Sequence, residues 1–162
     1  METIGFGGGC HWCTEAVFQH LRGVARVEQG WARGAGLAES EAVRVRFDPG
    51  TIDLATLVEV HLRTHASTSA HSLRGRYRSA VYVTDAAQRA RVEGLLAELQ
   101  SGFDAPLVTR TIPLAGFREN IEHYRDYYRT DPERPFCRTY IDPKLGELRR
   151  RFADVALWKG CV

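Results

Sequence analysis

The chain has 162 residues, of which 44% are hydrophobic and 26% are charged; this composition predicts one globular domain and excludes a disordered, collagen-like or coiled-coil protein. Its 22 basic and 20 acidic residues leave a net charge of +2, which is too small to indicate nucleic-acid binding. Four cysteines are too few for a disulfide-rich scaffold but enough for thiol chemistry.

The N-terminal half predicts a strand, a helix, two strands and a second helix. The clearest strand pattern is the alternation of apolar and polar side chains in 42–47, closed by Asp48-Pro49-Gly50. Asp53 is a suitable N-cap for the second helix. The predicted strands are 3–7, 24–31 and 41–47, and the predicted helices are 12–21 and 54–65.

The C-terminal half predicts a loop followed by alternating strands and helices. The elements are a loop at 66–76, strands at 77–84 and 107–114, helices at 85–100, 119–129 and 143–152, and a tail at 153–162. This order predicts an α+β fold of ferredoxin-like type, with helices on one face of a mixed sheet. No linker divides the chain, so 1–162 is expected to be one domain, with a core at about 3–137 and a C-terminal helix and tail at 138–162.

The start of the chain and its hydropathy predict a cytoplasmic protein. No basic stretch followed by an apolar segment is visible near Met1, so no signal peptide is expected. No run of about 18 apolar residues occurs, so no membrane partner is expected. In a reducing compartment, paired cysteines are catalytic or metal-binding more often than structural.

The segment Gly7-Gly8-Gly9-Cys10 places a cysteine at the start of a predicted helix. Glycines allow a tight turn and the close approach of another segment. Unpaired N–H groups and the positive end of the helix dipole favour an anion at this point, so they lower the pKa of a thiol from about 8.5. Cys10 is therefore the candidate nucleophile.

Cys13 follows Cys10 by three positions, a spacing that allows a redox disulfide. The structural alternative is that both cysteines are inert and act only as small buried hydrophobic residues. Two cysteines after three glycines favour the redox interpretation.

A zinc site is the other chemical alternative, because Cys-x-x-Cys supplies half of one. Cys137 and Cys161 lie 24 positions apart and form no second tight pair. His61 and His65 are four apart on a predicted helix but lack the adjacent glutamate of the zincin pattern. No metal site is therefore expected.

Four segments, in chain order, match the pattern of one known family. Gly9-Cys10-His11-Trp12-Cys13-Thr14-Glu15-Ala16 is similar to a signature of Gly-Cys-Phe-Trp, then a small residue or Cys, then Glu. The other segments are 40–49, 77–82 and 117–127, similar to an acid-bearing strand, a second strand and an aromatic-acidic helix. Together they span residues 4 to about 137. The chain resembles the A-type peptide methionine sulfoxide reductases, whose fold is a ferredoxin-like α/β sandwich.

The resemblance implies thiol-dependent reduction of methionine sulfoxide in peptides and proteins or as the free amino acid, with the S epimer as the expected substrate. In this family a thiolate attacks the sulfoxide sulfur, a carboxyl donates a proton to the oxygen, and a tyrosine hydrogen-bonds that oxygen. The implied catalytic residues are Cys10, Glu41, Tyr127 and Cys13, and the implied substrate-binding residues are His11, Trp12 and Glu122.

A second thiol must condense with the sulfenic acid that forms on Cys10. Cys13 is the nearest in the sequence, with Cys161 on the tail and Cys137 as alternatives. No bound cofactor is expected. The resemblance implies thioredoxin or another dithiol as reductant and partner.

Two departures from the family stand out. His11 occupies a position that usually holds Phe, so one wall of the methyl pocket is more polar, or the imidazole is a cation that lowers the pKa of Cys10. Only Ala32–Ser40 remains of a longer tyrosine-bearing loop, so one of the two tyrosines that hold the oxygen has no counterpart. The candidates to replace it are His65, His71 and Tyr77.

Two other classes of function stay open from the residues alone. A thioredoxin-like dithiol oxidoreductase also has Cys-x-x-Cys at a helix start, and later in its chain it has a Thr-Ile-Pro like Thr111-Ile112-Pro113 of this protein. This protein, however, lacks the proline that such enzymes carry between the cysteines. The thioredoxin-like class also does not account for Glu41 or Tyr127. The third class is a zinc-stabilised binding module.

Overall fold

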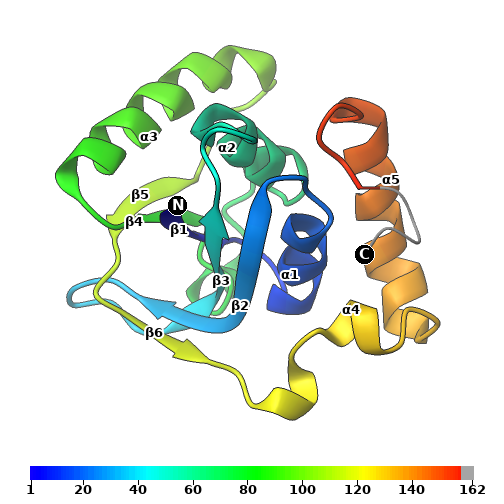
Figure 1. The fold of residues 1–162 in the computed structure, drawn as a ribbon. Helices are drawn as coiled ribbons and strands as arrows, with labels where there is room; N and C mark the ends of the chain where they lie inside the picture. Colours follow the sequence, from blue (N-terminus) through cyan, green and yellow to red (C-terminus); the bar gives the residue numbers. More distant parts are fainter. Residues whose placement is uncertain (158–162) are drawn as a thin grey trace.

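A mixed six-stranded sheet with the strand order β5-β4-β1-β3-β2-β6 forms the centre of the fold (Figure 1). The computed structural model describes residues 1–157. β4 and β5 pair in parallel, and the other neighbours are antiparallel. The predicted α+β class with a mixed sheet is confirmed. The strands are β1 (Glu2–Gly7), β2 (Val24–Arg33), β3 (Ser40–Phe47), β4 (Ala80–Val83), β5 (Arg110–Pro113) and β6 (Gly116–Glu119).

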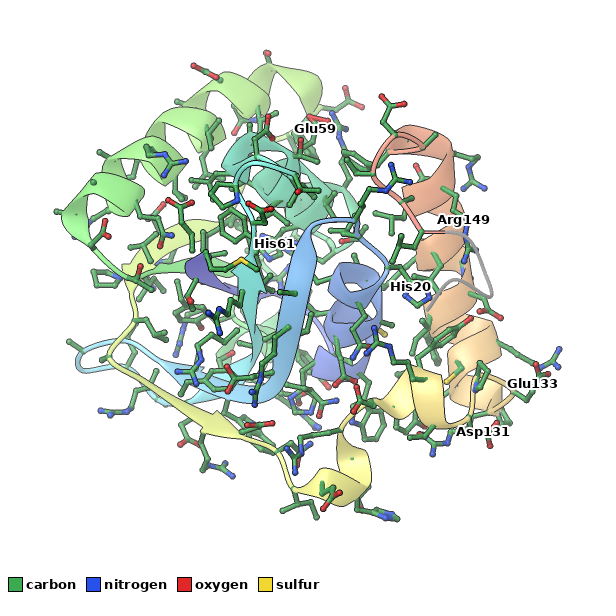
Figure 2. The ribbon with its side chains drawn as sticks, in the orientation of Figure 1. His20, Glu59, His61, Asp131, Glu133 and Arg149 are labelled. Atoms are coloured by element: carbon green, nitrogen blue, oxygen red, sulfur yellow. The ribbon has the colours of Figure 1, made fainter. Side chains whose placement is uncertain are left out.

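Helices from both halves of the chain pack on one face of this sheet. They are α1 (His11–Gln19), α2 (Leu54–Arg63), α3 (Ala86–Leu99), the short α4 (Tyr127–Thr130) and α5 (Asp142–Arg151). Alternate side chains of β1 and β3 point to this face, and Phe6 stacks on Phe18 of α1 with centroids 4.5 Å apart. His61 of α2 lies inside this layer (Figure 2). α5 lies beside α1 (Figure 1), so the C-terminal segment covers the helix that begins after Cys10.

The opposite face of the sheet carries a smaller apolar cluster, to which no helix in the described part of the chain contributes a side chain. Tyr82 is its largest buried side chain, and the loop residue Leu37 packs against it. Because the side chains of a strand alternate between the two faces, this face receives side chains of β2–β5 that the main core does not use. No helix within residues 1–157 has the length and apolar character needed to cross a membrane.

The predicted helix at 119–129 is wrong. The chain instead forms β6, a single 3-10 turn at Glu122–Tyr124, and the short helix α4. Asn120 donates its backbone N–H and its side-chain amide to Gln29 of β2, which keeps this segment extended beside the sheet. Asp126 has a positive φ of 53°, a conformation that interrupts a helix.

Two predicted strands are shorter in the structure. The strand predicted at 77–84 begins only at Ala80, and the one predicted at 107–114 covers only Arg110–Pro113. Before Ala80 the backbone bonds to the start of β3 instead: Glu41 N–H donates to the Arg76 carbonyl, and Arg78 N–H donates to the Ser40 hydroxyl. The predicted loop at 66–76 contains one 3-10 turn, Ser72–Gly75. These contacts place Arg76 beside Glu41.

Candidate active site

The glycine-rich turn between β1 and α1 places Cys10 at the N-cap of α1. The Cys10 carbonyl accepts the first hydrogen bonds of the helix, from the N–H groups of Cys13 and Thr14. Gly8 has a φ of 154°, and a Cβ there would lie 2.4 Å from the His65 ring. Only glycine therefore lets the turn pass against α2 and bring Cys10 to the helix end.

The two cysteines of the motif are in contact and differ in acidity. A hydrogen bond from the Cys13 thiol is the main reason that the pKa of Cys10 is lowered, and the N–H groups of Trp12 and Cys13 add to it; burial and the charge of Glu41 oppose the shift. The same bond and burial raise the pKa of Cys13. Cys10 is thus the more acidic thiol of the pair, and Cys13 is its hydrogen-bond donor.

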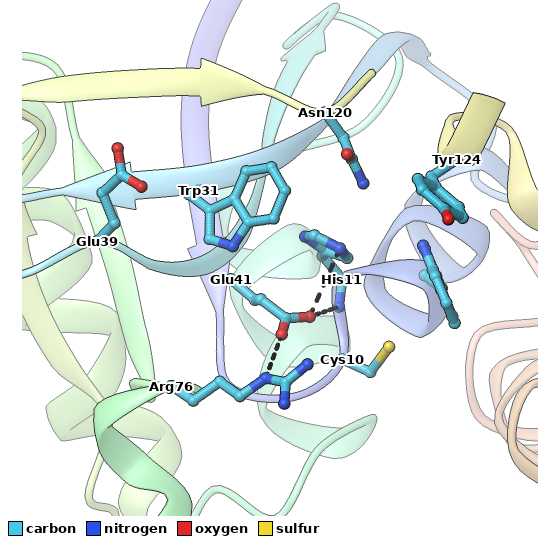
Figure 3. Close-up of a pocket in the computed structure, with 9 residues that line it drawn as sticks. Cys10, His11, Trp31, Glu39, Glu41, Arg76, Asn120 and Tyr124 are labelled. Carbon is cyan, nitrogen blue, oxygen red and sulfur yellow. Dashed lines mark hydrogen bonds and ion pairs between the residues drawn. The ribbon is translucent and has the colours of Figure 1, made fainter. Parts of the chain in front are cut away.

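Cys10 opens into a cavity of about 560 Å³ at the end of the sheet (Figure 3). Four of the predicted site residues line this cavity: Cys10, His11, Trp12 and Glu41. Five further lining residues were not predicted: Trp31, Glu39, Arg76, Asn120 and Tyr124. The indole, imidazole and phenol rings give the cavity an apolar, rigid wall, and the charged groups gather on one side.

Glu41 is the central charged group, between His11 and Arg76 (Figure 3). Its side chain is buried at the start of β3. Oε1 accepts the backbone N–H of His11 at 3.2 Å, and Oε2 accepts Nε–H of Arg76 at 2.7 Å. The Arg76 side chain is 68% exposed at the mouth of the cavity, and the bond to Glu41 raises its pKa.

Tyr127 and Glu122, both predicted to bind substrate or its oxygen, are not among the residues that line this cavity. Tyr127 packs against Trp12, and Glu122 is exposed in the 3-10 turn. Tyr124, from the same segment, lines the cavity instead. The turn at Glu122–Tyr124 and the short helix α4 give these side chains a different spacing from that of a continuous helix.

A second, small cavity of about 40 Å³ lies against both cysteines. His61 and His65 of α2 and Lys144 of α5 line it together with Cys10 and Cys13. Lys144 donates to the Thr64 carbonyl, and burial lowers its pKa. The predicted replacement His65 thus lies at this second cavity, while His71 and Tyr77 line neither of the two cavities.

Cys137 lies in the same apolar core as Cys13 but lines neither of the two cavities. Cys137 is buried in a π-helical turn, Cys137–Ile141, and its thiol donates to the Asp131 carbonyl. Cys161 lies outside the described residues. Cys10, Cys13 and Cys137 are free thiols.

His61 and His65, which lie four positions apart on the chain, each bond through a ring nitrogen to a backbone carbonyl. His61 donates through Nε2 to the Gly7 carbonyl at 2.7 Å, and Nδ1 of His65 donates to the His61 carbonyl. Among residues 1–157, no group of three or more His, Cys, Asp or Glu side chains could hold a metal ion.

The family model described as "Peptide methionine sulfoxide reductase" matches residues 2–156. The chain is 34% identical to peptide methionine sulfoxide reductase MsrA of Chromobacterium violaceum, over 96% of this chain and 98% of that protein.

Solved structures agree in fold. Mxr1 of Saccharomyces cerevisiae in reduced form superposes with a TM-score of 0.76 at 21% identity, covering 86% of this chain and 90% of that one. The structure of the same yeast protein in complex with Trx2 superposes with a TM-score of 0.64 at 21% identity, covering 75% of this chain and 81% of that one. With its Cys10 motif at the head of α1 and a family match over nearly its whole length, the chain belongs to the peptide methionine sulfoxide reductase family.

Proposed function

We propose that this protein reduces methionine sulfoxide, free or in peptides and proteins, to methionine through thiol chemistry at Cys10, with the S epimer as substrate. One observation carries the proposal: Cys10, the more acidic thiol of a contacting pair, opens into a cavity with aromatic walls and a buried carboxyl group. A thiolate, a proton source and an apolar methyl pocket are the three requirements of this reduction.

In the first step the Cys10 thiolate attacks the sulfoxide sulfur while the oxygen gains a proton. The S–O bond breaks, the oxygen passes to the cysteine, and methionine and a Cys10 sulfenic acid result. The sulfur of the substrate is reduced by two electrons and that of Cys10 is oxidised by two. Glu41 is the proposed source of the proton, because its carboxyl group is buried in the cavity beside Cys10 and accepts a hydrogen bond from the backbone N–H of His11.

The aromatic side of the cavity is the proposed site of the substrate methyl group. Trp12, Trp31 and Tyr124 line it, and a rigid ring surface binds an apolar group without ordering flexible side chains. We assign Tyr127 to the same wall through its contact with Trp12. Glu122 is assigned to substrate docking at the rim, since it is exposed in the turn that leads to Tyr124.

In the second step another thiol attacks the sulfenic sulfur, forms a disulfide and releases water. Cys13 is the proposed resolving residue because its thiol already contacts Cys10. Cys137 and Cys161 are the alternatives. A dithiol protein such as thioredoxin is the proposed reductant of this disulfide; the likeness to the fold of a yeast protein solved in complex with Trx2 supports this partner.

The test is a single turnover. Reduced protein is mixed with a methionine sulfoxide peptide without added reductant, methionine is counted, and the oxidised thiols are mapped by mass spectrometry. We expect about one methionine per chain and a Cys10–Cys13 disulfide, and no methionine from Cys10→Ser. If the wild-type protein forms no methionine, the proposed function is wrong.

The same assay separates the resolving thiols. Cys13→Ser should still form one methionine but accumulate the sulfenic acid, which a dimedone adduct detects. Cys137→Ser and Cys161→Ser are the matched controls and should form the Cys10–Cys13 disulfide normally. If the Cys13→Ser protein forms an intramolecular disulfide at the wild-type rate, Cys13 is not the resolving residue.

A further inference from the structure

His11 is held in a single tautomer by the sheet. Its Nδ1 lies 2.7 Å from the carbonyl oxygen of Gly30 in β2. A carbonyl oxygen can only accept a hydrogen bond, so Nδ1 must carry a hydrogen. The ring is buried and packs edge-on against Trp31, with centroids 5.1 Å apart. His11 therefore presents Nε2, and not Nδ1, to the reacting side of the cavity.

The atom that Nε2 faces is also an acceptor. Nε2 of His11 lies 3.5 Å from Oε1 of Glu41, and both side chains are only 6% exposed. With Nδ1 protonated, a neutral imidazole has only a lone pair at Nε2, and an ionised carboxylate has only lone pairs as well. Two buried acceptors turned toward each other repel, whereas one proton between them makes the contact attractive.

We propose that His11 is a further catalytic residue, which shares one proton with Glu41 along the Nε2–Oε1 contact and with it supplies that proton to the sulfoxide oxygen. This deepens the proposed function and rests on it. His11 lines the same cavity as Cys10 and is its neighbour in the chain, so the shared proton is held beside the reacting sulfur. The Glu41–His11 pair, called the proton pair, acts as a single general acid.

The groups around the proton pair keep its proton transferable. Burial lowers the pKa of His11, and the Gly30 carbonyl and the Glu41 charge oppose this shift only in part. Arg76, on the loop before β4, also lowers it. The imidazole therefore holds a second proton weakly, and the contact between Nε2 and Oε1 of Glu41 is what keeps a proton at this place.

The remaining titratable groups that face the proton pair are few. Cys10 precedes α1, Arg76 and Tyr77 lie before β4, Glu39 lies before β3, and Tyr124 belongs to the turn after β6. Of these, Cys10 is the one that changes its charge during the reaction. An ionised Glu41 raises the pKa of Cys10, so a protonated pair favours the thiolate, and the two proton equilibria are coupled.

This coupling closes the proton balance of a turnover. The thiolate and the protonated pair react with the sulfoxide to give methionine, a Cys10 sulfenic acid and a proton pair that lacks its proton. Condensation of the sulfenic acid with the second thiol releases water and changes no protonation of the pair. When the dithiol reductant opens the disulfide, the Cys10 thiol returns, and its proton restores the pair.

The first test is the pH profile of methionine formation by the His11→Phe protein. Without the imidazole, Glu41 holds the proton alone and loses it at lower pH. The alkaline limb of the profile should therefore move to lower pH by at least one unit. The rate at neutral pH should fall about tenfold or more. His123→Phe is the matched control at an exposed histidine and should keep the wild-type profile. An unchanged alkaline limb in His11→Phe would overturn the proposal.

The second test needs no change at His11 and no turnover. In Cys10→Ser protein labelled with nitrogen-15 histidine, NMR reports the protonation of each ring nitrogen. We expect Nδ1 of His11 to carry a hydrogen at every pH. As the pH rises, the chemical shift of Nε2 should move from the value of a nitrogen that shares a proton to the value of a nitrogen without one. A bare Nε2 throughout the active pH range would overturn the shared proton. Failure of the proposed function would appear differently, as absence of methionine from the wild-type protein at every pH.

Discussion

Trp12 and Tyr127 lie face to face, with ring centroids 4.1 Å apart and planes within 2° of parallel. Phe136 meets both rings edge-on, at 5.5 and 5.9 Å, and the Arg134 guanidinium lies over the Tyr127 ring at 4.1 Å. The indole that lines the cavity is therefore supported by a stack from the C-terminal part of the chain. We therefore propose that the ring of Tyr127, and not its hydroxyl, contributes to the site.

Two variants of Tyr127 separate the ring from the hydroxyl. Tyr127→Phe keeps the stack, so we expect kcat/KM for a sulfoxide peptide to stay within about twofold of wild type. Tyr127→Ala removes the ring; a stacked pair is worth about 0.5–1.5 kcal/mol, so kcat/KM should fall up to tenfold. Tyr124→Ala is the comparison variant inside the cavity and should lower kcat/KM at least as much, because it removes a ring that lines the proposed methyl site. A large loss in Tyr127→Phe would instead support the oxygen-binding role implied by the family resemblance.

Glu15 joins the motif helix to the segment that carries Tyr127. Its buried carboxylate accepts the backbone N–H groups of Asp126 at 2.9 Å and Tyr127 at 3.1 Å, and the Gln29 amide at 2.8 Å. Glu15→Ala leaves the N–H groups of Asp126 and Tyr127 without this acceptor, while the Gln29 amide keeps its bond to the Tyr124 carbonyl. Each buried unpaired group costs about 1–3 kcal/mol. We expect the free energy of unfolding in urea to fall by about 3 kcal/mol.

The control for this variant is Glu93→Ala on the outer face of α3. Glu93 pairs with Arg89, and both side chains are about half exposed, so the loss should be about 0.5 kcal/mol or less. Equal losses from the two variants would show that the Glu15 contacts contribute little to stability.

Gly30 permits the close approach of β6 to β2. A Cβ at this position would lie 2.0 Å from the Arg118 carbonyl oxygen. Gly30→Ala should therefore push β6 outward, lower the free energy of unfolding by about 1–3 kcal/mol and lower the activity, since Asn120 and Tyr124 follow this strand.

Gly94→Ala is the matched control in α3, with no atom within 4 Å of the added carbon. It should stabilise the protein by about 0.5–1 kcal/mol. Thermal unfolding and the turnover assay measure both, and a destabilised Gly94→Ala protein or a fully active Gly30→Ala protein would contradict this account.

The parts of the fold that could be predicted are those whose pattern is local. The alternation of apolar and polar side chains in β3 and the glycines before Cys10 each indicate the conformation of the residues that carry them. β6 and the turn after it could not be predicted, because 119–129 has the aromatic and acidic composition of a surface helix. What decides its conformation is a partner far along the chain, Gln29 for Asn120.

The same distinction applies to the candidate site. Cys10, His11, Trp12 and Glu41 stand in motifs and could be found in the sequence. Arg76 could not, because its position depends on the backbone bond between its carbonyl and the N–H of Glu41. The tyrosine that lines the cavity depends on where the chain turns.

His61 and His65 predict an acid-sensitive fold. Burial is the main cause that lowers the pKa of His65 to about 4 and that of His61 well below 6.5. Between pH 6.5 and 4 the unfolded chain therefore binds protons that the folded chain does not, so folding stability is full above pH 6.5 and decreases as the pH falls. For His65 alone the shift of about 2.5 units corresponds to about 3 kcal/mol.

The measurement is the free energy of unfolding in urea at a series of pH values from 7 to 4. The wild-type slope includes every group that titrates in this range, so the difference between variants is the readout. His65→Gln should flatten the slope, because it removes a group whose proton uptake opposes folding, even though the lost contact with the Ser79 hydroxyl lowers stability at pH 7. His123→Gln, at an exposed position, should leave the slope as it is. If His65→Gln keeps the wild-type slope, His65 takes up its proton equally in both states and the acid sensitivity arises elsewhere.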